Sequence, residues 1–134
     1  MPPSVPVAPE RLPILNSLLQ NFAAANSEVH LLLLTSEDGF EVASHPASDS
    51  RTARVAAMSS SIQALSDSLM REMGLARSNN LIVEADAGAI VVVGLHAAKP
   101  RMTLSIFTSK QQLLGKLLWA VRTLAASIEG ELSR

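Results

Sequence analysis

Apolar residues change their spacing several times along this chain, and each change marks an element. In residues 10–25 they recur every three or four positions, which predicts a helix that Asn26 ends. Residues 29–35 form an almost unbroken apolar run, typical of a strand buried on both faces. The turn 36–39 ends in Asp-Gly, which accepts positive φ angles, so a second strand over 40–44 is expected to return beside the first.

A long helix is predicted next, with Ser50 as its N-cap and Gly74 in the left-handed position that ends it near residue 73. Three strands follow, over residues 80–85, 89–96 and 102–108. Ser109 and Gln112 have the spacing of a capping box, and they open a last helix that carries apolar residues to Ile128. The predicted order is helix-strand-strand-helix-strand-strand-strand-helix, an α+β arrangement.

The ends of the chain bound one domain. Five of the seven prolines lie in the first thirteen residues, so residues 1–9 are expected to form a flexible tail. Residues 10–132 then make a single domain without internal repeats, which suits a chain of 134 residues.

The middle helix carries two contrasting faces. Six apolar residues form one stripe, which is expected to pack on the sheet: Val55, Met58, Ile62, Leu65, Leu69 and Met73. The opposite side carries Ala53, Ala57, Ser60, Ala64, Asp67 and Arg71. Small residues at this spacing allow a second helix to approach closely, whereas an ordinary solvated face is the simpler alternative. Because a solvated face more often carries Glu, Lys and Gln, the helix–helix contact is favoured.

Composition argues against several classes of function. The net charge is −1 and aromatic residues are few, so the basic or stacking surface of a nucleic-acid binder is not expected. Cysteine is absent, and the three histidines have no metal-ligand spacing, so neither thiol chemistry nor a metal or cofactor site is expected. No apolar run approaches the ~20 residues of a membrane helix. A P-loop or nucleophile motif is also missing, so we do not expect an enzyme.

Several local sequences, in their order and spacing, resemble the roadblock / dynein light chain family over about residues 10–130. The resemblance lies in the hairpin 34–44 with its Asp-Gly turn and Ala-Ser end, the Ala/Ser-rich middle helix, the apolar strand 89–95, and the last-helix start 113–117. It implies a profilin-like fold, in which a five-stranded antiparallel sheet has the middle helix on one face and the other two helices on the opposite face.

The resemblance also implies a homodimer. In this family the strand after the middle helix pairs with its copy, and the two middle helices pack side by side. On this chain that places the dimer interface at Ala53, Ala57, Ser60, Ala64, Leu81, Val83 and Ala85. The small-residue face of the middle helix points to the same surface independently of the family.

The family further implies a partner, because its prokaryotic members often act with small Ras-like GTPases. We therefore expect a cytoplasmic protein that binds and regulates such a GTPase, with contact candidates Arg54, Ser61, Asp67 and Arg71. An arginine could neutralise charge in GTP hydrolysis, although surface solvation is the simpler account of these arginines. The alternatives are a structural scaffold subunit with nucleotide-independent binding and, less favoured, a small-molecule sensor.

Overall fold

A computed structural model describes residues 7–109 and 114–133. A 3-10 turn, Pro9–Arg11, leads into the following elements: α1 (Leu12–Ala25), β1 (Val29–Ser36), β2 (Glu41–His45), α2 (Ser50–Glu72), β3 (Asn80–Ala85), β4 (Gly88–Leu95), β5 (Met102–Ser109) and α3 (Leu114–Leu132). This confirms the predicted α+β order of elements. The ends of the strands differ from the predicted ends by a few residues at most. The predicted capping box of the last helix involves Gln112, which lies outside the described residues.

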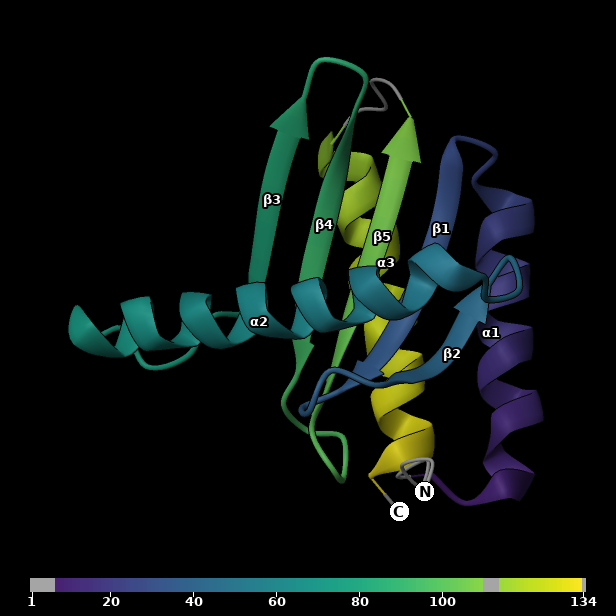
Figure 1. Ribbon diagram of the computed structural model, residues 1–134, viewed down its shortest axis with the longest axis horizontal. Helices are drawn as coiled ribbons and strands as arrows, with labels where there is room; N and C mark the ends of the chain where they lie inside the picture. Colours follow the sequence, from purple (N-terminus) through teal and green to yellow (C-terminus); the bar gives the residue numbers. More distant parts are fainter. Residues whose placement is uncertain (1–6, 110–113, 134) are drawn as a thin grey trace.

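The five strands form one antiparallel sheet in the order β2-β1-β5-β4-β3. Figure 1 shows α2 crossing one face of this sheet, while α1 and α3 cover the other face. The layers therefore match the predicted profilin-like arrangement. β2 and β3 are the two edge strands, because each pairs with a single neighbour.

The register divides the strand residues between the two faces. Aligned on the α1 and α3 side are Leu32, Ile106, Val91 and Ile82, one from each of β1, β5, β4 and β3. The next row faces α2 and consists of Leu33, Ser105, Val92 and Leu81. Since side chains alternate across a strand, a one-residue slip would exchange these rows, so the apolar core fixes the register.

The main core lies between the sheet and the helices α1 and α3. Leu15 and Leu19 of α1 are fully buried there, as are Val121 and Ile128 of α3. Each such side chain contributes about 1.5–3 kcal/mol through removal from water. Val7, within the predicted tail, also contributes a buried side chain to this core.

Asp49, rather than the predicted Ser50, caps the N-terminus of α2. Its carboxylate accepts hydrogen bonds from the backbone N–H groups of Arg51 at 2.9 Å and Thr52 at 3.1 Å. The Thr52 hydroxyl in turn accepts from the Asp49 backbone N–H at 3.0 Å, which completes a capping box. The helix dipole, which is positive at this end, adds to the stabilisation by the ionised carboxylate.

The other end of α2 is closed as the sequence predicts. Gly74 has a φ of 71°, and its N–H donates to the Arg71 carbonyl at 3.0 Å. The Leu75 N–H reaches back to the Met70 carbonyl at 2.8 Å, which completes a Schellman motif.

The capping hydrogen bonds from Thr52 and Arg51 hold the pKa of Asp49 below its usual value of 3.8. Stability from this carboxylate is therefore fully present above pH 3.8 and is lost as the pH falls through the lowered pKa. We predict that Asp49→Asn, which keeps a neutral cap, has a lower free energy of unfolding than the wild type at neutral pH. In strong acid the two proteins should differ much less. Urea unfolding midpoints of both proteins across this range measure the difference; a difference independent of pH would contradict the assignment.

Candidate interaction surface

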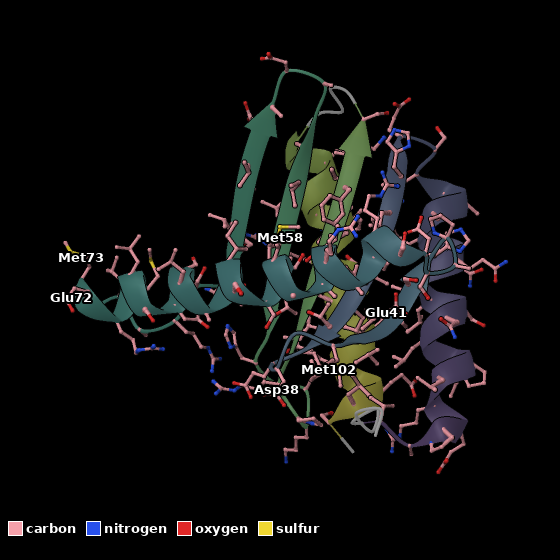
Figure 2. All side chains as sticks on the ribbon, viewed as in Figure 1. Asp38, Glu41, Met58, Glu72, Met73 and Met102 are labelled. Atoms are coloured by element: carbon pink, nitrogen blue, oxygen red, sulfur yellow. The ribbon has the colours of Figure 1, made fainter. Side chains whose placement is uncertain are left out.

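The apolar stripe of α2 points away from the sheet, so the predicted orientation of this helix is wrong. Five of its six members are exposed: Met58, Ile62, Leu65, Leu69 and Met73, with Leu65 and Met73 each 69% exposed. Figure 2 shows Met58 and Met73 on the same side of α2, the side toward the β3–β4 turn. Only Val55 is half-buried. The residues that do face the sheet are Thr52, Ala56, Ser59, Ser60 and Gln63.

This orientation follows from the part of the sheet that α2 crosses. Beneath α2 the sheet carries the small polar side chains of Thr35, Thr103 and Ser105 beside the buried apolar Leu33 and Val92. A helix face of Ser, Thr, Ala and Gln can approach this mixed surface closely. The Ser60 hydroxyl, for example, donates to the Glu37 carbonyl at 2.7 Å.

Two glycines allow this close packing. A Cβ on Gly39, whose φ is 90°, would lie 3.3 Å from the Ala57 Cα. A Cβ on Gly94 would lie 2.7 Å from Gln63 Nε2 and 2.6 Å from His96 Nε2. These atoms are the ends of two side chains, so a larger residue at position 94 would displace the Gln63 and His96 side chains.

A polar network around Ser78 joins α2 to the start of β3. The Ser78 N–H donates to Asp67 Oδ1 at 2.7 Å, and its carbonyl accepts from His96 Nε2 at 2.8 Å and Gln63 Nε2 at 3.3 Å. Its hydroxyl bonds to that of Ser66 at 2.8 Å. Ser78 is only 5% exposed, and every one of its polar groups is satisfied. The network therefore fixes the position of α2 relative to the edge strand β3, which begins two residues later.

The predicted β3 residues lie on the α2 side of the sheet. Leu81 is half-buried, whereas Val83 and Ala85 are exposed. The far edge of β3 forms no strand pairing among the described residues. We refer to the exposed stripe of α2 and the apolar α2-side residues of β3 together as the α2–β3 surface: Met58, Ile62, Leu65, Leu69, Met73, Leu81 and Val83.

The predicted small-residue face is divided by the structure. Ala53, Ala57 and Ala64 are exposed on the other flank of α2, where Ala53 and Ala57 line a hollow with Phe40 and Ala64 lines another with Glu37. Ser60 instead faces the chain's own sheet and is buried, so it is not available to a second helix as predicted.

The predicted partner-contact residues are also separated. Arg54, Ser61 and Arg71 are exposed on α2. Ser61 donates to the Ala57 carbonyl at 2.9 Å and Arg71 to the Ser68 hydroxyl at 3.2 Å, both within the helix. Asp67 is half-buried, and one of its oxygens is committed to the network at Ser78.

The described residues show few other features of a chemical site. They contain no group of three or more His, Asp or Glu side chains arranged to hold a metal ion. None of the helices within residues 7–109 and 114–133 is both long and apolar enough to cross a membrane.

A sequence comparison assigns this helix–sheet–helix arrangement to a known family. The family model of the Roadblock/LC7 domain matches residues 15–97, more than half of the chain. The chain belongs to the Roadblock/LC7 domain family. This Roadblock/LC7 match covers α2 and β3 completely, so it includes the surface described above.

Solved structures with a similar fold include two MglB proteins. The gliding protein MglB of Thermus thermophilus is 15% identical with a TM-score of 0.81, and 98% of each chain is covered. Myxococcus xanthus MglB is 14% identical with a TM-score of 0.74, covering 90% of this chain and 92% of its own. A Roadblock/LC7 domain from Streptomyces avermitilis is 18% identical with a TM-score of 0.79, and the match covers 89% of this chain and 98% of the Streptomyces chain. At these identities the similarity establishes the shared fold alone, and no curated protein matches the sequence.

Asp67 gives a test of the Ser78 network. Asp67→Ala leaves the Ser78 N–H without its acceptor, so we predict a loss of about 1–3 kcal/mol in the free energy of unfolding. Arg71→Ala, one turn along the same helix, is the matched control and is expected to change stability little. Urea unfolding at a fixed protein concentration measures both. Equal stability of the two variants would mean that the network does not hold α2 in place.

Proposed function

We propose that this Roadblock/LC7 chain is a homodimeric protein-interaction module that binds and regulates a small Ras-like GTPase. The observation that carries the first half of this proposal is the outward apolar stripe on α2. Exposed apolar areas of this extent usually mark an interaction site. Here the stripe also adjoins an unpaired strand edge, so one partner could cover both.

The energetics favour a partner that covers the whole α2–β3 surface. Burial of five large side chains gives on the order of 10 kcal/mol at the usual apolar coefficient. Association itself costs about 4–15 kcal/mol, so the stripe alone gives a marginal complex. Backbone pairing along β3 and contact through Leu81 and Val83 supply the further stabilisation.

The geometry supports a second copy as that partner. Figure 1 shows that α2 continues beyond β3, so the end of the helix that carries Leu69 and Met73 overhangs the edge of its own sheet. A two-fold axis at β3 would pair this strand with its copy and bring each overhanging helix end toward the other protomer. Such an arrangement uses one patch twice, as symmetric dimers do.

This arrangement revises the predicted interface. The interface proposed here consists of the stripe on α2 with Leu81, Val83 and Ala85, while Ala53, Ala57 and Ala64 lie on the opposite flank of α2 and are left out of it. Ser60 is left out because it binds the chain's own β1–β2 turn.

The GTPase half of the proposal comes from the family. Roadblock proteins in bacteria often act with small Ras-like GTPases, and the fold is shared with MglB proteins. Arg54, Ser61 and Arg71 are exposed polar residues on α2 and are the candidate contacts. In this proposal the chain is a cytoplasmic regulator and not itself an enzyme. It acts either by positioning the GTPase's own residues or by supplying an arginine to the transition state.

Light scattering after size exclusion tests the dimer. We predict that Leu65→Glu lowers the mass from a dimer to the 14.2 kDa monomer, because a charge would be buried in the apolar seam. Trp119→Glu is the matched control, since Trp119 is 72% exposed and lies on α3, across the sheet. A Leu65→Glu protein that remains dimeric would place the interface elsewhere.

Pull-down with a co-encoded Ras-like GTPase tests the regulatory role. We expect binding to differ between the GTPase loaded with a GTP analogue and with GDP, and to weaken when Arg54 or Arg71 is changed to Glu. The matched control is Arg122→Glu on α3. Binding that is equal in both nucleotide states would favour the scaffold alternative. A lack of binding in both states would reject the GTPase as partner and leave the dimer untouched.

A further inference from the structure

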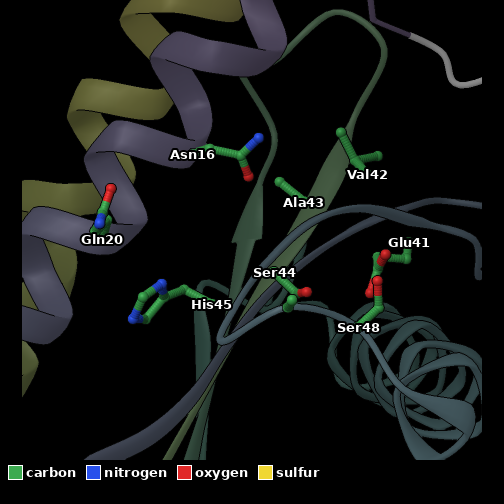
Figure 3. A pocket seen from close by; sticks show the side chains of 9 residues that line it. Asn16, Gln20, Glu41, Val42, Ala43, Ser44, His45 and Ser48 are labelled. Carbon is green, nitrogen blue, oxygen red and sulfur yellow. The ribbon is translucent and has the colours of Figure 1, made fainter.

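A groove of about 450 Å³ follows the outer edge of β2, far from the α2–β3 surface. All five residues of β2 line it, which means that the groove runs along the whole strand. Figure 3 shows Asn16 and Gln20 of α1 on one side of the groove and Glu41 and Ser48 on the side toward α2. The groove thus has the length and direction of a strand.

The floor of this groove is an open sheet edge. β2 pairs with β1 alone, and its other edge forms no backbone hydrogen bond among the described residues. Open edges are usually protected by a lysine, an internal proline or a covering segment. β2 contains neither residue, and over its five residues the outer N–H and C=O groups form no backbone hydrogen bond within the described part of the chain.

One polar atom at the groove lacks a hydrogen-bond partner among residues 7–109 and 114–133. Glu41 Oε1 is buried and accepts no hydrogen bond among the described residues. Glu41 lies between the groove and an adjoining hollow lined by Asp38, Phe40 and Asp49. The described part of the chain forms a single ion pair, between Arg101 and Glu37. The carboxylates of Asp38, Glu41 and Asp49 are therefore not paired with a basic side chain there. Oε1 itself has almost no accessible surface, so a ligand would meet Glu41 through the accessible part of this half-buried side chain, and an unpaired acid in such a place favours a cationic neighbour.

We propose that the β2 groove binds an extended peptide segment of another protein, which adds a strand to β2 and places a Lys or Arg side chain beside Glu41. Backbone pairing along the edge supplies affinity, as in other cases of strand addition. The basic head satisfies Glu41, with Asp38 and Asp49 nearby. Its aliphatic stem lies against Phe40, whose side chain is 48% exposed, where a cation–π contact adds to the apolar one.

The remaining lining of the groove indicates which residue types the bound segment carries. Apart from Glu41 and His45, the polar groups along it are the neutral side chains of Asn16, Gln20, Ser44 and Ser48. These groups accept and donate hydrogen bonds but offer no deep apolar pocket. The segment is therefore expected to carry small or polar residues such as Thr and Ser and a single basic residue at the Glu41 end.

The test uses the full chain and short blocked peptides that alternate Thr and Val, each with one Arg, one Glu, or no charge near the same end. We expect the Arg peptide to bind about tenfold more tightly than the Glu peptide, the range of a charge-assisted hydrogen bond. Amide NMR shifts and slowed hydrogen exchange should map to residues 41–45, Asn16 and Gln20. N-methylation of alternate peptide amides, which removes the donors of one edge, should abolish binding.

Charge reversal separates recognition from folding. Glu41→Lys is expected to reverse the protein's preference between the two peptides, so that the Glu peptide binds more tightly than the Arg peptide. A groove that is merely damaged would bind neither peptide. Glu10→Lys, in the turn before α1, makes the same change in charge away from the groove and should preserve the wild-type order.

Three results would overturn the proposal: no binding by any peptide, binding that survives N-methylation, or shifts that map away from β2. Assembly beyond a dimer through β2 without any peptide would also overturn it, because a second copy would then occupy the edge. The groove and the hollow beside it share no residue with the α2–β3 surface, so failure of this proposal leaves the proposed dimer standing, and the converse also holds.

Discussion

The packing of α2 on the sheet is the contact on which the exposed surface of this protein depends. The helix approaches the sheet through Ser59, Ser60 and Gln63, and two glycines in the sheet and its turn make room for it. Because the polar and small side is used inside, the apolar side has to face outward. A monomer thus displays a helix whose amphipathic character is reversed relative to an ordinary surface helix.

The network at Ser78 gives this reversed helix a fixed position. Asp67 and Gln63 bind Ser78 from α2, and His96 binds it from the end of β4. The loop that leads into β3 is thereby tied to the helix, so the stripe and the strand edge form one surface of defined shape. A rigid surface loses less entropy on association, which favours a specific complex over loose aggregation. The β2 edge, at the other end of the sheet, is outside this network and is free to serve a separate partner.

The order of elements was predictable because its signals are local. Apolar spacing separated helices from strands, the Asp-Gly turn marked the first hairpin, and Gly74 marked the end of α2. The helix cap was displaced by one residue because Ser50 and Asp49 are both good caps, and only the geometry with Thr52 shows which one is used. These are small errors of local structure.

The orientation of α2 was not predictable in the same way. Apolar periodicity locates a stripe, but it cannot tell burial inside one chain from burial between chains. The deciding information lies in Gly39, Gly94 and Thr103, which are distant in sequence and meet α2 only in the folded sheet. Ser60 was misplaced for the same reason. The β2 groove was not predicted either, because α1 and β2 form it together and no sequence pattern identifies an open strand edge.

A distance measurement across the proposed two-fold axis tests the central claim most directly. The chain has no cysteine, so Glu84→Cys gives a single spin label on β3, on an exposed side chain. Strands of six residues span about 20 Å, so if β3 pairs with its copy the two labelled backbones lie within about that distance. We predict a strong dipolar coupling at this range, which disappears on dilution with unlabelled protein. Labels that show no coupling, or a much longer distance, would contradict pairing through β3.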